Sequence, residues 1–166
     1  MDNLPFNTAD EIASTTTGEP VITQSPTDTS DTEITVDKLP DGYLANGYHV
    51  TTDNGYKYLR TEFVSTDAKT IASGLSTMKP SDFNGLLKEI KKSRKRSLPF
   101  EARLTALVEM LPKALALVNH KKAPVLLVSF VEANIAAVQN DEDFSAFIRH
   151  VDCIAAYMTV QKGGGK

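Results

Sequence analysis

The chain lacks most of the residue patterns that mark secreted, membrane-spanning or disulfide-linked proteins. It has one cysteine and no tryptophan in 166 residues, so no disulfide framework is possible and a reducing cytosol is the expected compartment. The N-terminus has neither a basic region nor an apolar run, so it does not read as a signal peptide. The two most apolar stretches, 104–118 and 123–138, are short and interrupted by charged or polar residues. We therefore expect a cytoplasmic protein with no membrane partner.

Motifs for catalysis are also missing. The sequence has no GxxxxGK[ST] phosphate-binding loop and no GxSxG nucleophile elbow. His49, His120 and His150 are scattered, and only His150 and Cys153 have the spacing of a metal pair. A structural zinc site needs four ligands, and the sequence supplies no others with the usual spacing. We therefore expect Cys153 to be a small buried apolar residue. We expect no enzymatic activity, no metal site and no cofactor.

The net charge of −3 hides a division between two parts of the chain. Residues 1–56 hold ten acids and one base, whereas residues 57–166 hold eleven acids and seventeen bases. Residues 1–37 contain twelve Ser or Thr and a single aromatic residue, which predicts a disordered acidic tail. The tail could act as an acidic mimic that shields the basic part, although a solvated tail is the favoured interpretation.

Residues 38–62 form a turn-rich lead-in segment. The turn sequence 53–55 lies between 48–52 and 56–60, which predicts a possible short hairpin. A lone hairpin is marginal in water and must pack against something else. The segment holds four tyrosines that could stack on nucleic-acid bases, although packing is the commoner role: Tyr43, Tyr48, Tyr56 and Tyr58.

In residues 63–160 the apolar residues recur with a helical period of 3.6 residues. This pattern predicts a compact bundle of five helices, so the expected fold class is all-α. The expected helices start near Ser65 or Thr66, Pro80, Pro99, Pro124 and Asp141. The proline at position 112 lies inside the third apolar stripe and should kink or split that helix. Residues 161–166 read as a flexible end.

The fifth helix has the clearest pattern. Asp141 is its expected N-cap, and Glu142 and Asp143 suit the positive end of the helix dipole. Its apolar stripe is regular and consists of Phe144, Phe147, Ile148, Val151, Ile154, Ala155 and Met158.

The strongest functional signal is a dense run of bases on the second predicted helix. Six bases fall within residues 88–96, opposed by Glu89 alone. This density and single sign favour contact with a nucleic-acid backbone over a solvated face or an anionic membrane surface. Such residues hold phosphates and do not read sequence. The candidate RNA-binding residues are Lys88, Lys91, Lys92, Arg94, Lys95, Arg96, Arg103, Lys113, Lys121 and Lys122.

Two other functions fit the same charge pattern. The protein could be a stand-alone helical DNA-binding protein of the nucleoid type. It could also be a protein–protein adaptor whose bases dock an acidic partner.

Four segments together resemble a known family. Residues 147–157, FIRHVDCIAAY, resemble a closing F-V-x-F-F-E-A-L-V-A-Y-H, with Asp152 in place of Glu and Met158 in place of the final His. Residues 111–121 resemble L-x-P-K-L-A-Y-A-A-G-R with one residue inserted, with Leu117 for Tyr and Lys121 for Arg. Residues 77–88 resemble a T-x-S-Q-L-R-K-F-Y helix start that keeps Ser81 but has Asp82 and Asn84 in place of Gln and Arg. Residues 41–44, DGYL, resemble a glycine-aromatic segment before the first helix. The family is the small subunit of type III-A CRISPR effector complexes.

The resemblance covers roughly residues 40–158 and carries clear expectations. It implies a five-helix, non-catalytic subunit that stacks in several copies along an RNA-guided antiviral complex. The implied partners are the backbones of guide RNA and target RNA, the large polymerase-nuclease subunit, the repeated backbone subunits and other copies of itself.

Overall fold

The computed structural model describes residues 37–94 and 97–163 of the chain. The predicted acidic tail, residues 1–37, lies outside the described residues except for Asp37. The described part confirms the expected all-α class, with a small hairpin in front. Its elements are β1 (His49–Thr51), β2 (Lys57–Leu59), the 3-10 helix η1 (Thr61–Val64), α1 (Thr66–Gly74), α2 (Pro80–Ser93), α3 (Phe100–Val108), α4 (Met110–Asn119), α5 (Leu126–Ala137) and α6 (Asp141–Gly163).

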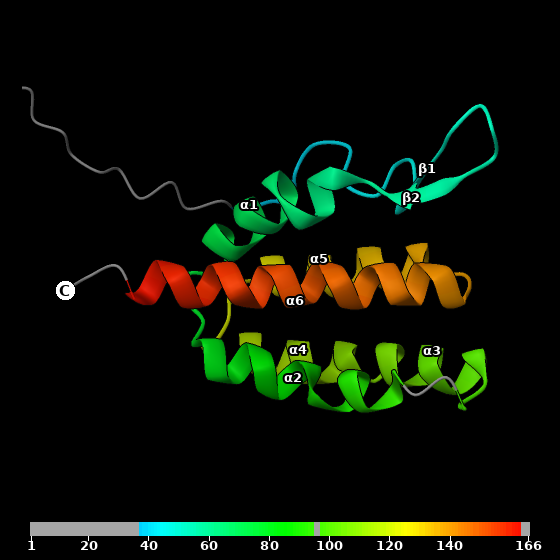
Figure 1. Cartoon of the computed structure of the whole chain (residues 1–166). Coiled ribbons are helices and arrows are strands. Elements are labelled where there is room, and N and C mark those ends of the chain that lie inside the picture. Colours follow the sequence, from blue (N-terminus) through cyan, green and yellow to red (C-terminus); the bar gives the residue numbers. More distant parts are fainter. Residues whose placement is uncertain (1–36, 95–96, 164–166) are drawn as a thin grey trace, which may run out of the picture. The chain divides into compact units, whose positions relative to one another are not determined.

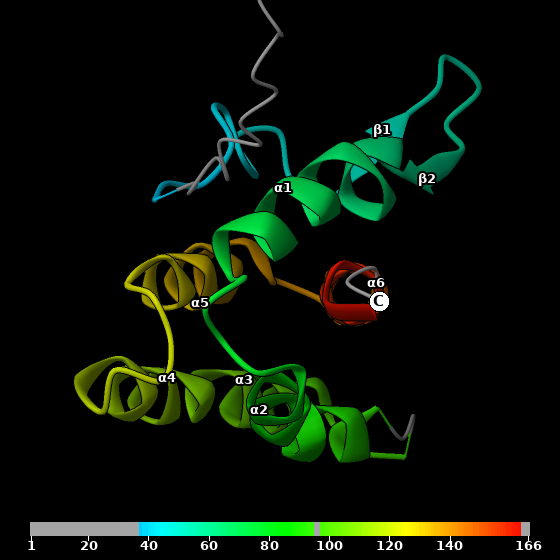
Figure 2. The same ribbon diagram turned by 90° about the vertical axis from the view of Figure 1, so that its left-hand side faces the viewer.

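The helices from α1 to α6 form three layers. α6 is the longest and lies in the middle, with α1 packed along one side and α2 along the other (Figure 1). Viewed along α6, α1 forms one layer, α5 and α6 a second, and α2, α3 and α4 a third (Figure 2). The hairpin belongs to the α1 side and continues along α6.

The six α-helices correspond to the five that the sequence predicts, because the third is split. Its two parts, α3 and α4, meet at Glu109. Pro112 causes the split, since it has no N–H to donate to the Val108 carbonyl and its ring would clash there. As the third residue of α4, Pro112 lies in a first turn, where an N–H has no helical partner anyway.

The core centres on the apolar face of α6. The predicted stripe is buried except for Ala155, which is half-buried. Ala146 and His150 are buried as well, because α1 and α2 cover α6 from two sides. Each fully buried phenylalanine in such a core contributes about 1.5–3 kcal/mol.

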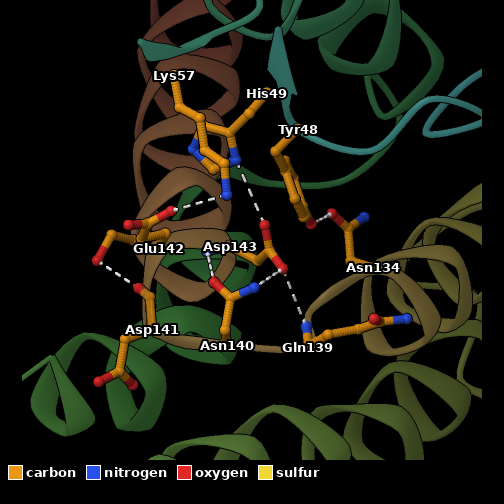
Figure 3. A network of polar contacts seen from close by, with 10 residues as sticks. Tyr48, His49, Lys57, Asn134, Gln139, Asn140, Asp141, Glu142 and Asp143 are labelled. Atoms are coloured by element: carbon orange, nitrogen blue, oxygen red, sulfur yellow. Dashed lines mark hydrogen bonds and ion pairs between the residues drawn. The ribbon is translucent and has the colours of Figure 1, made fainter. Parts of the chain in front are cut away.

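Both ends of α6 differ from the sequence expectation. The N-cap is Asn140 and not Asp141: the Asn140 Oδ1 accepts a hydrogen bond from the Asp143 N–H at 3.0 Å, and its Nδ2 donates to the Asp143 carboxylate at 2.8 Å (Figure 3). This reciprocal pairing resembles a capping box. The helix runs to Gly163, beyond the predicted domain boundary at 160, because no glycine or proline precedes Gly163 in it. Residues 164–166 of the predicted flexible end lie outside the described residues.

The predicted hairpin is confirmed. β1 and β2 pair antiparallel, with Val50 opposite Tyr58. Gly55 closes the turn with φ 78°, a conformation that glycine adopts without steric cost. The four tyrosines divide evenly: the rings of Tyr43 and Tyr48 pack against Phe63, whereas Tyr56 and Tyr58 are 75% and 50% exposed.

A buried polar network holds the lead-in segment on the helices. The side chain of Asn134 on α5 accepts a hydrogen bond from the Tyr48 hydroxyl at 2.5 Å and donates to the Tyr43 hydroxyl at 3.0 Å and the Phe130 carbonyl at 2.6 Å. The Tyr43 hydroxyl also lies 2.9 Å from His150 Nε2 on α6. Burial raises the pKa of both tyrosines, so their hydroxyls stay protonated and can donate.

The histidine in this network has a defined protonation state. His150 Nδ1 lies 2.5 Å from the Phe63 carbonyl, which can only accept, so Nδ1 carries the proton and Nε2 accepts from Tyr43. Burial lowers the pKa of His150 to about 4. Both ring nitrogens are engaged, so His150 and Cys153 do not form a metal pair. No group of three or more potential metal ligands occurs among the described residues.

The buried histidine predicts a loss of stability in mild acid. The unfolded chain binds a proton on His150 near the ordinary pKa of 6.5, whereas the folded chain does so only near 4. The stability from neutral His150 is therefore fully present above pH 6.5 and is lost as the pH falls towards 4. The loss should reach roughly 3 kcal/mol. Urea unfolding between pH 7 and 4.5 measures it.

The matched variants for that experiment are His150→Gln and His120→Gln. His120 is an exposed histidine at the end of α4. We expect the pH dependence to flatten in the first variant and to persist in the second. An unchanged slope in His150→Gln would contradict the assignment.

Candidate nucleic-acid interface

Helix α2 is amphipathic in the way the sequence predicts. Phe83, Leu86, Leu87 and Ile90 are buried, and the bases occupy the remaining surface. The structure divides these bases into two groups that face different neighbours. One group faces α6, and the other surrounds Glu89 on the side of α4.

The bases that face α6 are held by a carboxylate. Lys91 Nζ lies 2.9 Å from Asp152 Oδ1, and the Arg94 guanidinium lies 3.9 Å from Asp152 Oδ2. The three side chains are between 37% and 65% exposed. Ion pairs this exposed contribute at most about 1 kcal/mol, so a phosphate could compete for either base.

The second group forms a cationic cluster around one acid. Lys92 Nζ donates to the Glu89 carboxylate at 2.9 Å. This hydrogen bond lowers the pKa of Glu89, and the charges of Lys113 and Lys88 add to the effect. Lys88 and Lys113 make no ion pair among the described residues, and both are exposed. Three bases against one acid leave a local excess of positive charge, which we call the Glu89 cluster (Lys88, Lys92 and Lys113).

Two further bases lie at the end of α4. The Lys121 and Lys122 N–H groups donate to the Val118 and Leu117 carbonyls, which is the Schellman pattern that closes many helices. Lys121 takes the left-handed position with φ 55°, where glycine is usual. Both lysines are exposed and make no ion pair within the described part of the chain.

Arg103 differs from the other candidates. Its side chain is 7% exposed, pairs with Asp141 at 2.8 Å and stacks over the Phe144 ring. Because this guanidinium is covered and already paired with a carboxylate, we interpret Arg103 as a structural residue and correct the sequence assignment. The sequence does not reveal this role, because the ion pair joins Arg103 on α3 to Asp141 on α6, which are far apart in the chain. Lys95 and Arg96 lie outside the described residues.

A groove over the first turns of α6 contains basic residues that the sequence analysis missed. It is a hollow of about 970 Å³. Its walls come from β2, the end of α2, α3 and the first three turns of α6. Arg149 and Arg94 both line it. Arg149 was missed because it is far from the basic run in sequence, although its place outside the apolar stripe marked it as exposed. We call this hollow the α6 groove; its lining residues are His49, Lys57, Tyr58, Leu59, Arg94, Arg103, Asp141, Glu142, Phe144, Ser145, Ala146 and Arg149.

The acids of the α6 groove already have partners. Lys57 Nζ lies 3.8 Å from Glu142, and His49 Nδ1 lies 3.4 Å from the neighbouring Asp143 (Figure 3). Asp141 is paired with Arg103. Because these acids are paired with bases, the remaining charged side chains that line the groove are basic.

Comparisons with protein-family models, with curated proteins and with solved structures give no match. Among the described residues, no helix combines the length and apolar character needed to span a membrane.

The pair between the covered Arg103 and the exposed Asp141 predicts an asymmetry between two acids in the first turn of α6. Asp141→Asn leaves the covered guanidinium of Arg103 without its carboxylate, and should cost about 2 kcal/mol of unfolding free energy. Glu142→Gln removes the same charge from the same helix end but breaks only an exposed pair, so it should cost about 0.5 kcal/mol. Urea unfolding of both variants tests this. Equal losses would show that the helix dipole alone accounts for the effect.

Proposed function

We propose that the protein is a non-catalytic RNA-binding subunit whose basic helical surface holds RNA phosphates. The observation that carries this proposal is the set of exposed bases without an acidic partner among the described residues, on α2, α4 and the turn after α4. Backbone contact needs only such positive groups within reach of successive phosphates.

The resemblance of the sequence supports a more specific role. The segment that resembles the family's final motif lies within α6, and the L-P-K segment begins in the first turn of α4. We therefore propose a small subunit of a type III CRISPR RNA-guided complex, present in several copies and contacting the guide RNA–target RNA backbone in antiviral defence. Its protein partners would be the large polymerase-nuclease subunit, the repeated backbone subunits and other copies of itself.

Purification of the tagged protein from its native host tests this role. We expect co-purification of short guide RNAs and of several protein subunits. Recovery of duplex DNA with the protein alone would favour a stand-alone DNA-binding protein. Recovery of an acidic protein partner that survives nuclease treatment would favour an adaptor.

Neutralising the Glu89 cluster should weaken RNA binding and its dependence on salt. In a Lys88→Gln/Lys113→Gln double variant, the slope of log affinity against log salt should fall by roughly 1 per lysine. Fluorescence anisotropy across a salt series measures both quantities. Lys69→Gln is the matched control, because Lys69 is an exposed lysine on α1, in the opposite outer layer (Figure 2). An unchanged slope in the double variant would rule out this surface.

Removing an acid should have the opposite effect. Asp152→Asn releases Lys91 and Arg94 from their carboxylate and should tighten RNA binding several-fold at low salt. The same titration with Glu132→Gln, an exposed acid on α5, is the control. Equal tightening by both variants would mean that only net charge matters, and not the release of these two bases.

A further inference from the structure

The α6 groove carries a surplus of positive charge. Leaving out His49, its lining residues include four bases and two acids. Two of those bases, Arg103 and Lys57, are paired with the two acids, Asp141 and Glu142. What remains for a ligand is the pair of guanidiniums of Arg94 and Arg149.

These two arginines are available in the described structure. Arg149 is exposed and has no ion pair within the described residues. Arg94 is 65% exposed and reaches Asp152 only at 3.9 Å. Guanidinium groups bind phosphates through two parallel hydrogen bonds and also stack on planar rings. Two of them in one hollow therefore favour a ligand with phosphates and flat groups.

The same groove presents an aromatic ring and apolar surface. Tyr58 lines it and is 50% exposed, and Leu59 and Ala146 add apolar lining. Pairing with Val50 fixes the backbone of Tyr58 on β2, and its side chain lines the groove. The fold therefore places this aromatic residue in the groove before a ligand binds, which lowers the entropic cost of using it for binding.

We propose that the α6 groove binds a segment of single-stranded RNA, with phosphates on Arg94 and Arg149 and a base stacked on Tyr58. This inference rests on the proposed RNA-binding function and names the form of RNA that this second site takes. The paired bases of a double helix offer no free face for stacking on Tyr58, whereas the bases of a single strand do. Positive grooves with an aromatic platform are typical of single-strand binding. An acidic peptide would satisfy the arginines but would leave the ring without a role.

Anisotropy titrations of the full-length chain can test the proposal. The probes are a labelled single-stranded RNA without self-complementarity, the same strand annealed into a duplex, and the single strand with abasic sites. Tyr58→Leu should weaken binding of the single strand roughly tenfold and leave duplex binding unchanged. Arg149→Gln should lower the salt slope for the single strand by about 0.7.

Tyr56→Leu is the matched control for the ring. Tyr56 is a more exposed tyrosine of the same hairpin and does not line the groove, so its loss should leave both affinities unchanged. The abasic strand tests stacking without any change to the protein. It should bind the intact chain about as weakly as the ordinary strand binds Tyr58→Leu.

The outcomes separate this inference from the proposed function. If Lys88→Gln/Lys113→Gln weakens binding while Tyr58→Leu and Arg149→Gln do not, the groove is not an RNA site and the proposed function stands. If the intact chain binds neither single strand nor duplex, both fail. If a polyglutamate peptide displaces the single strand and the abasic strand binds as well as the ordinary one, the groove is a general anion site and the inference is wrong.

Discussion

The fold depends on one buried side chain, the amide of Asn134. It satisfies all its hydrogen-bonding groups at once, and its partners come from the lead-in segment and from its own helix, α5. A buried amide without these partners would cost several kcal/mol, so the network is stable only when the lead-in segment is docked. The docked segment then sets the path of the hairpin along α6, with His49 and Lys57 reaching the acids of its first turn (Figure 3). The hairpin in turn supplies one wall of the α6 groove.

Acids on α6 pair with several of the bases that neighbouring elements bring to it. Asp152 holds Lys91 and Arg94 loosely, whereas Asp141 holds Arg103 in a covered pair. The difference lies in the burial of the base: an exposed pair exchanges partners at little cost, but the covered Arg103 guanidinium would be left as an uncompensated charge without Asp141. A run of bases on one helix therefore does not by itself define a binding surface, because acids on the helix packed against it can pair with some of those bases.

Local patterns predicted most of the fold and only part of the candidate site. The spacing of the apolar residues predicted the helices, and Pro112 predicted the split between α3 and α4. Both predictions succeed because they depend only on residues a few positions apart in the chain. The N-cap of α6 was misplaced by one residue, because Asn140 and Asp141 are both good caps and only the backbone geometry selects between them. Arg149 was missed because nothing near it in the sequence is basic. It belongs to a cationic site only because the fold brings it into the same groove as Arg94, at the end of α2.

The sequence by itself determined the all-α class, the hairpin, the split helix and the excess of bases after residue 57. Each of these depends on residue type and spacing along the chain, which short-range sterics and periodic burial translate directly into structure. The tertiary structure alone decided that His150 is a neutral core residue, that Arg103 is structural, and that Arg94 and Arg149 share a groove. Burial and ion pairing depend on distances through space between residues far apart in the chain, and only packing brings those residues together.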